Sequence, residues 1–387
     1  MRIMGQRATN GNRAARFAAV ATGLIAAARN RVALLVPTTG PNAAVGQSIA
    51  SAATMALLDT QAVRIDLQVY DTAPGAAAAA AKALGEGAKL ILGPLLAADV
   101  RAVQPLASAA NVPVLTFSND AALAGGGTYV LGFQPNQAIA RVVAYARSRG
   151  VERFAALVPA GVYGQRSATA FLRAVEAAGG KVVAVQTYPR TSAGLLLAAR
   201  KLTGYDARAA AATKTAALRP DGTVAQVSKS LAPVAFQALL IADTGQIAAA
   251  VAPALAQFGA GNVIVLGTEL WGSEPGLPRA TALHGAVFAA VPDDRFRQLA
   301  ARYRDKFGGS PSRLASLGYD GVLLAASAAS GWMPGTPFPR AALTAASGFT
   351  GIDGFFRFGP SGVAERGLEV EQVAATGFAV VAPAKAE

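Results

Sequence analysis

The chain has 387 residues, of which 53% are hydrophobic and 15% charged, and its formal net charge is +13 at pH 7. This composition is typical of a folded chain long enough for two domains of ordinary size, and it excludes a disordered protein. Cysteine is absent, which excludes structural disulfides, zinc–thiolate sites, cysteine nucleophiles and a lipid-anchored cysteine.

The first residues differ from the rest of the chain. Arg2, Arg7, Arg13 and Arg16 occur without an acid and precede the apolar stretch FAAVATGLIAAA. A basic head, a short apolar stretch and a small-residue exit are the three parts of a secretory signal, whereas a membrane span needs about 20 apolar residues. We therefore expect residues 1–28 to be signal-like and the protein to be exported to the periplasm; a disordered start is the alternative.

From residue 31 onward, apolar strands alternate with helices. The predicted strands read RVALLVP, IDLQVYD, KLILGP and VPVLTFS, and after TYVLGFQPN the rhythm restarts with RFAALVP, KVVAVQTY, AFQALLIA and NVIVLG. Helices are predicted over 47–58, 76–84, 99–110, 137–148, 165–178 and 246–258. Near-continuous apolar strands are typical of parallel sheets covered on both faces. We therefore predict an α/β protein with two lobes, each a doubly wound, mainly parallel sheet flanked by helices.

Each predicted lobe is assembled from separate parts of the chain. Lobe 1 is expected to comprise 31–135 plus 293–355, and lobe 2 is expected to comprise 136–292 plus 356–387. The segment 200–230 carries six basic residues against two acids and lacks a clear period past Ala217. We interpret it as a basic surface insertion within lobe 2, with helical propensity in its alanine run; a docking loop is the alternative.

Motifs for catalysis and cofactor binding are missing. His284 is the single histidine, which argues against most transition-metal sites and against a Ser-His-Asp arrangement. The sequence has no G-x-S-x-G, no G-x-x-x-x-G-K-[ST], and no G-x-G-x-x-G after the first strand. Glu269 and Glu274 flank Trp271 and would suit acid–base chemistry, but no further partner accompanies them. We expect a binding protein with no catalytic residue, no cofactor and no metal.

The positive charge by itself would suit nucleic acid, anionic lipid or anionic wall polymer. The sequence contains no run of five like charges and no basic patch interleaved with aromatic residues. A nucleic-acid partner is therefore not expected. A DNA-binding regulator would also need a helix-turn-helix in front of residue 31, and the apolar segment there does not provide one.

The order of these motifs resembles the type I periplasmic binding proteins, the fold of the branched-chain amino acid binding proteins. The resemblance extends from Arg31 to about Val373. It rests on RVALLVPTTGPNAAVGQS, DTAPGAAAAAAKAL, KLILGPLLAADV, VPVLTFSND, LVPAGVYGQRSATAFLRAVEAAGGKVV and LGYDGVLLA. It implies two lobes, with a ligand held beyond the carboxyl ends of the strands.

Within that superfamily the chain is most similar to the penicillin-binding protein activators. The similarity rests on ILGPLLAADV, LVPAGVYGQRSATAFLRAV, AFQALLIADTGQIAAAVAPAL and FTGIDGFFRFGPSGVAERGLEV. It implies a non-catalytic periplasmic regulator that contacts a bifunctional penicillin-binding protein and stimulates peptidoglycan synthesis. Peripheral association with the outer membrane would follow, here without a lipid-anchor cysteine.

The alternative is a solute receptor that delivers a small molecule to an ABC transporter permease. Resemblance to the amino acid binders places the candidate ligand positions at Ser118, Asn119, Asp120, Tyr163, Thr244 and Glu269. In that resemblance Glu269 matches the acid that pairs with a ligand ammonium. The amino acid binders also offer a hydroxyl after the Gly-Pro turn, where this chain has LLAA at 95–98. A leucine-type ligand is therefore not expected, and a cationic ligand is left open by Asp120 and Glu269.

Overall fold

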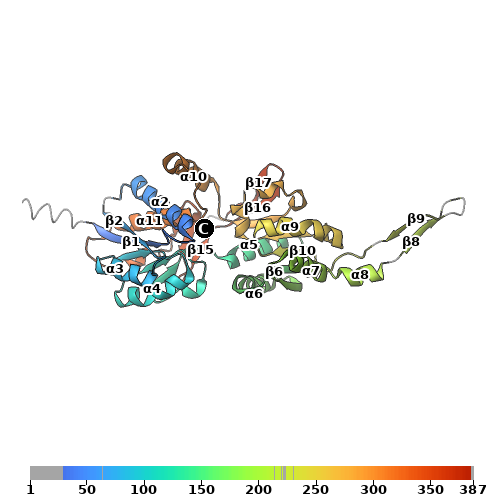
Figure 1. Cartoon of the computed structure of the whole chain (residues 1–387). Helices are drawn as coiled ribbons and strands as arrows, with labels where there is room; N and C mark the ends of the chain where they lie inside the picture. Colours follow the sequence, from blue (N-terminus) through green and yellow to red (C-terminus); the bar gives the residue numbers. More distant parts are fainter. Residues whose placement is uncertain are drawn as a thin grey trace, which may run out of the picture. The chain divides into compact units, whose positions relative to one another are not determined.

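The structure, a computed structural model, describes residues 29–384 apart from 63, 213, 219, 221–223 and 230. The signal-like segment predicted at 1–28 therefore lies outside the described residues. The chain divides into two compact units (Figure 1). Lobe 1 comprises the described residues up to Phe133 together with Asp294–Glu365, and lobe 2 comprises Gln134–Asp293 together with the described residues from Arg366 onward.

The chain passes between the two units three times. The last passage, from lobe 1 to lobe 2, lies at Glu365–Arg366 and not at the expected 355–356. The reason is a small three-stranded sheet, which takes up the chain after residue 348. Its strands are β13 (Phe349–Gly351), β14 (Gly354–Phe358) and β15 (Ala364–Arg366), of which β13 and β14 are antiparallel.

Lobe 1 is built on a five-stranded, fully parallel sheet. Its strands follow the order β2-β1-β3-β4-β5 and are β2 (Ile65–Asp71), β1 (Asn30–Val36), β3 (Leu90–Leu92), β4 (Val114–Thr116) and β5 (Thr128–Val130). Helices cover both faces of this sheet (Figure 1). They are α2 (Ala43–Asp59), α3 (Ala76–Gly85), α4 (Ala97–Ala109), α10 (Asp294–Phe307) and α11 (Ala315–Ala329).

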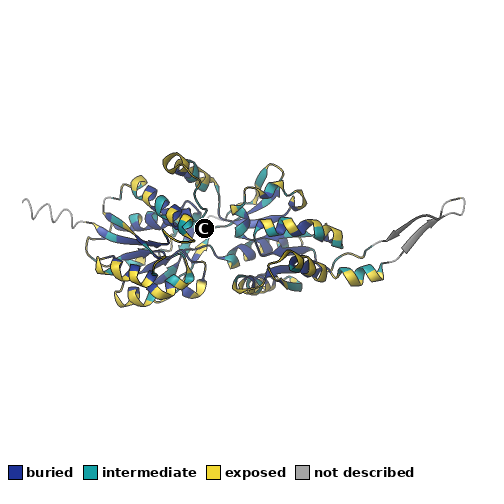
Figure 2. Ribbon diagram, in the orientation of Figure 1, coloured by how far each residue is buried: buried dark blue, intermediate teal, exposed yellow. Residues whose placement is uncertain are grey.

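Successive side chains of β1 point to opposite faces of the sheet, and each face is covered by different helices. Val32 and Leu34 pack into the core that contains α2 and α11, whereas Ala33 and Leu35 pack against α3 and α4. All four side chains are fully buried, as Figure 2 shows for the strands in general. A strand buried on both faces reads as a continuous apolar run, and this is why the sequence predicted a covered parallel sheet.

Lobe 2 holds a seven-stranded sheet that mixes parallel and antiparallel neighbours. Its strands follow the order β17-β16-β12-β11-β10-β6-β7 and are β17 (Gly377–Ala382), β16 (Glu369–Ala374), β12 (Val287–Ala290), β11 (Ile264–Gly267), β10 (Ala238–Ile241), β6 (Arg153–Pro159) and β7 (Lys181–Tyr188). The strands from β12 to β7 are parallel, whereas β16 pairs antiparallel with β12 and β17 pairs antiparallel with β16.

The helices of lobe 2 also cover both faces of its sheet. They are α5 (Pro135–Ser148), α6 (Val162–Ala177), α7 (Ser192–Leu202) and α9 (Gly245–Leu255). Phe154 and Ala156 of β6 pack with α5 and α6, and Ala155 and Leu157 pack with α7 and α9. The predicted fold class, two lobes with mainly parallel sheets flanked by helices, is confirmed.

The segment expected to be a basic insertion contains its own local structure. Its alanine run lies in α8 (Tyr205–Ala211), and β8 (Lys214–Leu218) pairs antiparallel with β9 (Val224–Lys229) in a separate two-stranded sheet. Arg208 fastens α8 to the rest of lobe 2, because its guanidinium donates to the carbonyls of Thr203 (2.9 Å), Ala232 (2.8 Å) and Phe258.

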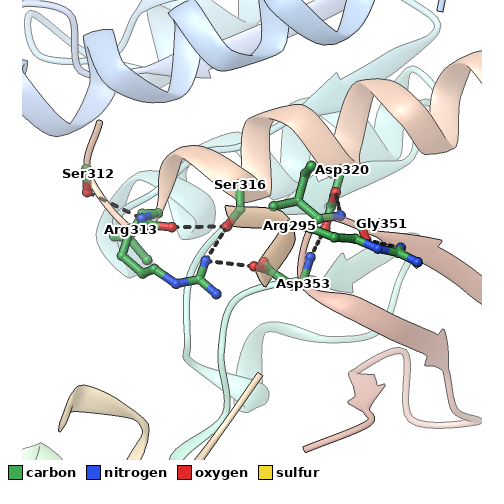
Figure 3. A network of polar contacts seen from close by, with 9 residues as sticks. Arg295, Ser312, Arg313, Ser316, Asp320, Gly351 and Asp353 are labelled. Atoms are coloured by element: carbon green, nitrogen blue, oxygen red, sulfur yellow. Dashed lines mark hydrogen bonds and ion pairs between the residues drawn. The ribbon is translucent and has the colours of Figure 1, made fainter. Parts of the chain in front are cut away.

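A buried polar network joins the later segments of lobe 1 (Figure 3). Arg313 pairs with Asp353 at 2.7 Å; the Asp353 side chain is 0% exposed and that of Arg313 15%. Asp320, also buried, accepts hydrogen bonds from the backbone N–H groups of Ile352 (2.7 Å) and Asp353 (3.3 Å). The network therefore holds the turn between β13 and β14 against α11.

The guanidinium of Arg313 also lies over two aromatic rings. Its Cζ atom is 4.2 Å from the ring centroid of Phe296 and 5.5 Å from that of Phe133. Phe133 is the last residue of the first lobe 1 segment, and Phe296 lies at the start of the second. Arg313 thus contacts the end of the first lobe 1 segment and the start of the second.

No helix in the described part of the chain is long and apolar enough to cross a membrane.

Two glycines set how closely α2 in lobe 1 and α6 in lobe 2 approach the strand that precedes each helix. A Cβ atom at Gly46 in α2 would overlap the carbonyl oxygen of Pro37, and one at Gly164 in α6 would overlap that of Pro159. Since both obstacles are backbone atoms at a strand end, a larger residue would push the helix away. Gly164 in this way holds the start of α6 at the carboxyl edge of the lobe 2 sheet.

We expect Gly46→Ala to lower the free energy of unfolding of lobe 1 by about 1 to 3 kcal/mol, because overpacking forces backbone shifts. Gly85→Ala is the matched control. Gly85 is the last residue of α3 with no atom within 4 Å of an added Cβ, so this change will cost nothing or will stabilise by up to about 1 kcal/mol. Urea denaturation of both variants checks this, and equal losses would contradict it.

Candidate functional site

Several polar side chains of lobe 2 follow parallel strands at the points where those strands end. Tyr163 comes after β6, Tyr188 ends β7, Asp243 follows β10, and Thr268 and Glu269 follow β11. Because the carboxyl ends of parallel strands meet at one edge of a sheet, these side chains gather there, which is where open α/β sheets bind ligands. We call this set the lobe 2 edge.

Tyr163, predicted from the sequence, contacts Thr268, the residue directly before the predicted Glu269. The Tyr163 hydroxyl is 3.3 Å from Thr268 Oγ1. Burial, and then the negative charge of Glu269, raise the pKa of the Tyr163 hydroxyl. The lobe 2 edge therefore contains a pair of hydroxyls, and the residue after Thr268 in the chain is the acid Glu269.

Glu269 is the least satisfied of these groups. Its Oε2 atom is shielded from solvent and has no hydrogen-bond partner among the described residues. Burial raises the pKa of the Glu269 carboxyl to about 7, and the group's own backbone N–H opposes the rise. A carboxylate oxygen that is shielded from solvent and has no partner is costly for folding and is available to an incoming donor.

Asp243, in contrast, is fully engaged within the protein. Tyr188 donates its hydroxyl to Asp243 Oδ2 at 2.5 Å, and Arg190 lies 3.5 Å from the same oxygen. The other oxygen, Oδ1, accepts the backbone N–H of Thr244 at 2.8 Å. Burial, and then the hydrogen bond to Asp243, raise the pKa of the Tyr188 hydroxyl. Sequence reasoning missed this group, although its position directly after an apolar strand was a usable signal.

Thr244, also predicted, has a structural contact. It is the N-cap residue of α9, where its Oγ1 accepts the backbone N–H of Ile247 at 3.4 Å. Glu274 accepts the backbone N–H of Gly245 at 2.7 Å at the same helix end. The protein's own side chains thus occupy this helix terminus.

In lobe 1 the three predicted residues follow β4. Asn119 is exposed, whereas Ser118 and Asp120 are buried. Ser118 Oγ accepts the backbone N–H of Asp120 at 3.2 Å, and Asp120 Oδ2 pairs with Arg101 at 2.8 Å. Asp120 Oδ1 also accepts the N–H of Ala122. The charge of Asp120 is therefore matched by Arg101, a partner that sequence reasoning did not identify.

In the described ranges, no group of three or more histidine, cysteine, aspartate or glutamate side chains is arranged to hold a metal ion.

A family model described as "Periplasmic binding protein" matches residues 30–377. The match covers both lobes and the whole of the lobe 2 edge.

Solved structures of low sequence identity share the fold. A candidate branched-chain amino acid ABC transporter protein from Rhodospirillum rubrum aligns with a TM-score of 0.73 at 21% identity, over 91% of this chain and 100% of that one. A solute-binding protein of an ABC transporter from Rhodopseudomonas palustris, solved with 3,4-dihydroxybenzoic acid, gives 0.66 at 19%, over 93% and 97%. A leucine-binding protein from Thermotoga maritima gives 0.62 at 18%, over 92% and 99%. At these identities the likeness shows the fold alone.

A curated relative is also similar over part of its length. It is an uncharacterised protein from Rickettsia prowazekii, 32% identical over 136 residues, which are 35% of this chain and 36% of that protein. The chain thus matches about a third of this relative.

Proposed function

Because the chain belongs to the periplasmic binding protein family, we propose that it captures a small solute and delivers it to the permease of an ABC transporter. The family binds solutes, and the chain is a binding protein rather than an enzyme. Glu269 carries the proposal: its carboxylate lies at the carboxyl edge of a parallel sheet with one oxygen unpartnered. Such a group is suited to a donor supplied by a ligand.

We assign ligand contacts to Glu269, Tyr163 and Thr268 in lobe 2, and to Ser118 and Asn119 in lobe 1. Thr268 is added because its hydroxyl is fully buried beside Tyr163. Asp120 and Thr244 were candidates from the sequence. We propose that they shape the edges of the two lobes, since each caps a helical turn.

A transporter function agrees with the named structural neighbours, two of which are described as parts of ABC transporters and one as a leucine-binding protein. These descriptions favour the solute receptor, which was the alternative from the sequence, over the penicillin-binding protein activator. We propose a periplasmic location, as the family name implies.

The activator function keeps one specific observation in its favour. The segment with α8 and the β8–β9 sheet forms a structure separate from both lobe sheets, as a docking element would. Its test is pull-down of a bifunctional penicillin-binding protein with the full chain and with a variant in which a short Gly-Ser linker replaces 212–231. Capture that depends on the segment would support the activator function.

The solute-receptor function is tested by a thermal-shift screen of amino acids, amines, polyamines and aromatic acids. A ligand that binds only the folded state stabilises it by about 2.7 kcal/mol at a concentration of 100 times Kd. We expect a saturable rise in Tm with at least one of these solutes, confirmed by calorimetry. A flat response across the screen, with the protein folded by circular dichroism, would contradict the proposal.

A further inference from the structure

The lobe 2 sheet ends in a strand whose outer side is open. β17 is the terminal strand of that sheet (Figure 1), and it pairs antiparallel with β16 on its inner side. In the part of the chain that the structure describes, no strand or bridge pairs with its outer side. The outward backbone N–H and C=O groups of β17 are therefore available to a strand from another molecule.

β17 is well held on its inner side and is not a loose chain end. The ring of Phe378 packs edge-on against that of Phe288 in β12, with the two centroids 5.0 Å apart. The guanidinium of Arg141 in α5 donates to the carbonyl of Pro383, the residue after the strand, at 3.0 Å. Pairing with β16 is regular from Gly377 to Val380 and shifts register only beyond that point. The strand thus presents a fixed outer edge.

The side chains of β17 make this edge apolar. The strand reads GFAVVA and contains no charged or polar side chain. Ala379, Val380 and Val381 are all exposed. Because Ala379 and Val380 are neighbours in a regular stretch of strand, they point to opposite faces of the sheet. The edge is therefore apolar on both faces, which favours pairing with another strand.

The other three edges of the two lobe sheets have a protection that β17 lacks. β2 contains Asp66 and Asp71, and β7 begins with Lys181. The chain itself covers the outer side of β5, where Val130 donates its backbone N–H to the carbonyl of Gly362 at 2.8 Å. Charge and cover are the usual means by which proteins prevent strand pairing between molecules. Among the described strands of the lobe sheets, β17 is the edge with neither.

A second copy of this chain is the partner that suits such an edge. A two-fold axis brings the donors of an antiparallel strand opposite the acceptors of an identical strand, so the edge is its own complement. A charged strand would meet its own charge across that axis, and like charges in opposite positions are destabilising. The chain as a whole carries a formal net charge of +13, whereas β17 is uncharged and meets no like charge in any register.

We propose that β17 pairs antiparallel with β17 of a second copy, so that the lobe 2 sheets of the two chains form one continuous sheet about a two-fold axis. The apolar side chains on both faces of the strand would then cover one another. The proposal is independent of the solute-receptor function, because none of the residues assigned to ligand contact lies on β16 or β17.

Sedimentation velocity of the full chain at increasing concentration tests the proposal. We expect a dimer whose share rises with concentration, and we expect Val380→Lys to weaken it at least about tenfold, because two lysines then meet at the axis. Val380 is 53% exposed, so the single chain should keep its fold, which circular dichroism checks. Leu197→Lys in α7 is the matched control: Leu197 is 55% exposed in the same lobe, and its variant should dimerise as the unchanged chain does.

A mixture of two variants tests whether the strand faces itself. Val380 lies near the middle of β17, so a two-fold pairing brings residue 380 of the two chains close together. Val380→Glu alone should weaken the dimer as Val380→Lys does, whereas an equimolar mixture of the two should restore it through opposite charges.

Three results would overturn the proposal. The first is a chain that stays monomeric at every concentration. The second is a dimer that Val380→Lys leaves intact, which would place the contact on another surface. The third is a mixture of the lysine and glutamate variants that dimerises no better than either variant alone, which would show that β17 does not meet β17.

Discussion

Asp353→Asn is expected to lower the free energy of unfolding of lobe 1 by about 3 to 5 kcal/mol, since removing one partner of a buried ion pair leaves the other charge uncompensated. The change would leave the Arg313 guanidinium, which is only 15% exposed, without the carboxylate that lies 2.7 Å from it. The rings of Phe133 and Phe296 cannot replace that carboxylate, because a cation–π contact contributes only about 0.5 to 2 kcal/mol.

The two tryptophans allow the loss to be assigned to one lobe. Trp332 lies in lobe 1 and Trp271 in lobe 2, and both are buried. In a Trp271→Phe background, urea denaturation followed by fluorescence reports on lobe 1 through Trp332. The control is Glu365→Gln, which breaks the exposed pair with Arg357 and should cost less than about 1 kcal/mol. Similar losses in the two variants would refute the argument.

Replacement of both buried partners gives a sharper result. The double variant Arg313→Met, Asp353→Leu removes the charges together, so we expect it to unfold at a higher urea concentration than Asp353→Asn alone. A double variant that is less stable than the single one would show that packing around the pair, not its charge, dominates.

Glu269→Gln is expected to stabilise lobe 2 at pH 8 by about 1 to 3 kcal/mol and to leave its stability unchanged near pH 4. Burial raises the pKa of Glu269 from 4.5 to about 7 in the folded protein. The folded state therefore binds this proton more tightly than the unfolded state does. Any stability that comes from the protonated form is present below pH 4.5 and is lost as the pH rises through about 7. Glutamine, which does not ionise, avoids that loss.

Urea denaturation at pH 4, 6 and 8, followed through Trp271 in a Trp332→Phe background, measures this dependence. The difference between Glu269→Gln and the unchanged glutamate should grow with pH, while Glu176→Gln should show no such growth. If the difference in the free energy of unfolding between Glu269→Gln and the unchanged chain is constant with pH, burial does not raise the pKa of the Glu269 carboxyl. If the prediction holds, the residue that costs stability is also the one proposed to bind the ligand.

The sequence predicted the buried parallel strands well because they are local and continuous. IDLQVYD, RFAALVP and KVVAVQTY are strands over the residues expected. Helix starts were less accurate: α2 begins at Ala43 and not at 47, and α6 begins at Val162 and not at 165. Neither helix has a side-chain cap, so the usual serine, threonine or aspartate signal was missing.

The antiparallel strands β16 and β17 could not be predicted in the same way. Their pairing with β12 joins residues far apart in the chain, such as Val287 and Gln372. The β8–β9 hairpin was also not anticipated, because its sequence lacks a clean alternation that would mark two strands.

At the candidate site, the resemblance to amino acid binders indicated which residues to consider, but not which contacts their side chains make. It selected Glu269 and Tyr163, and the Tyr163 hydroxyl lies 3.3 Å from Oγ1 of Thr268, the residue before Glu269. It could not tell that Glu269 Oε2 has no partner or that Asp120 is paired with Arg101, because both facts depend on how separate segments pack. The importance of Asp243 depends in the same way on Tyr188, a residue on a different strand.

The passages of the chain between the two units have a consequence for how the protein forms during synthesis. Lobe 1 needs α11, which is made only after most of lobe 2, and the lobe 2 sheet needs β16 and β17 from the last residues described. Domains usually fold in the order in which they are made, but neither lobe here can be completed early. Each keeps exposed apolar surface until its later segments have been made, so its folding must wait for contacts that are distant in sequence.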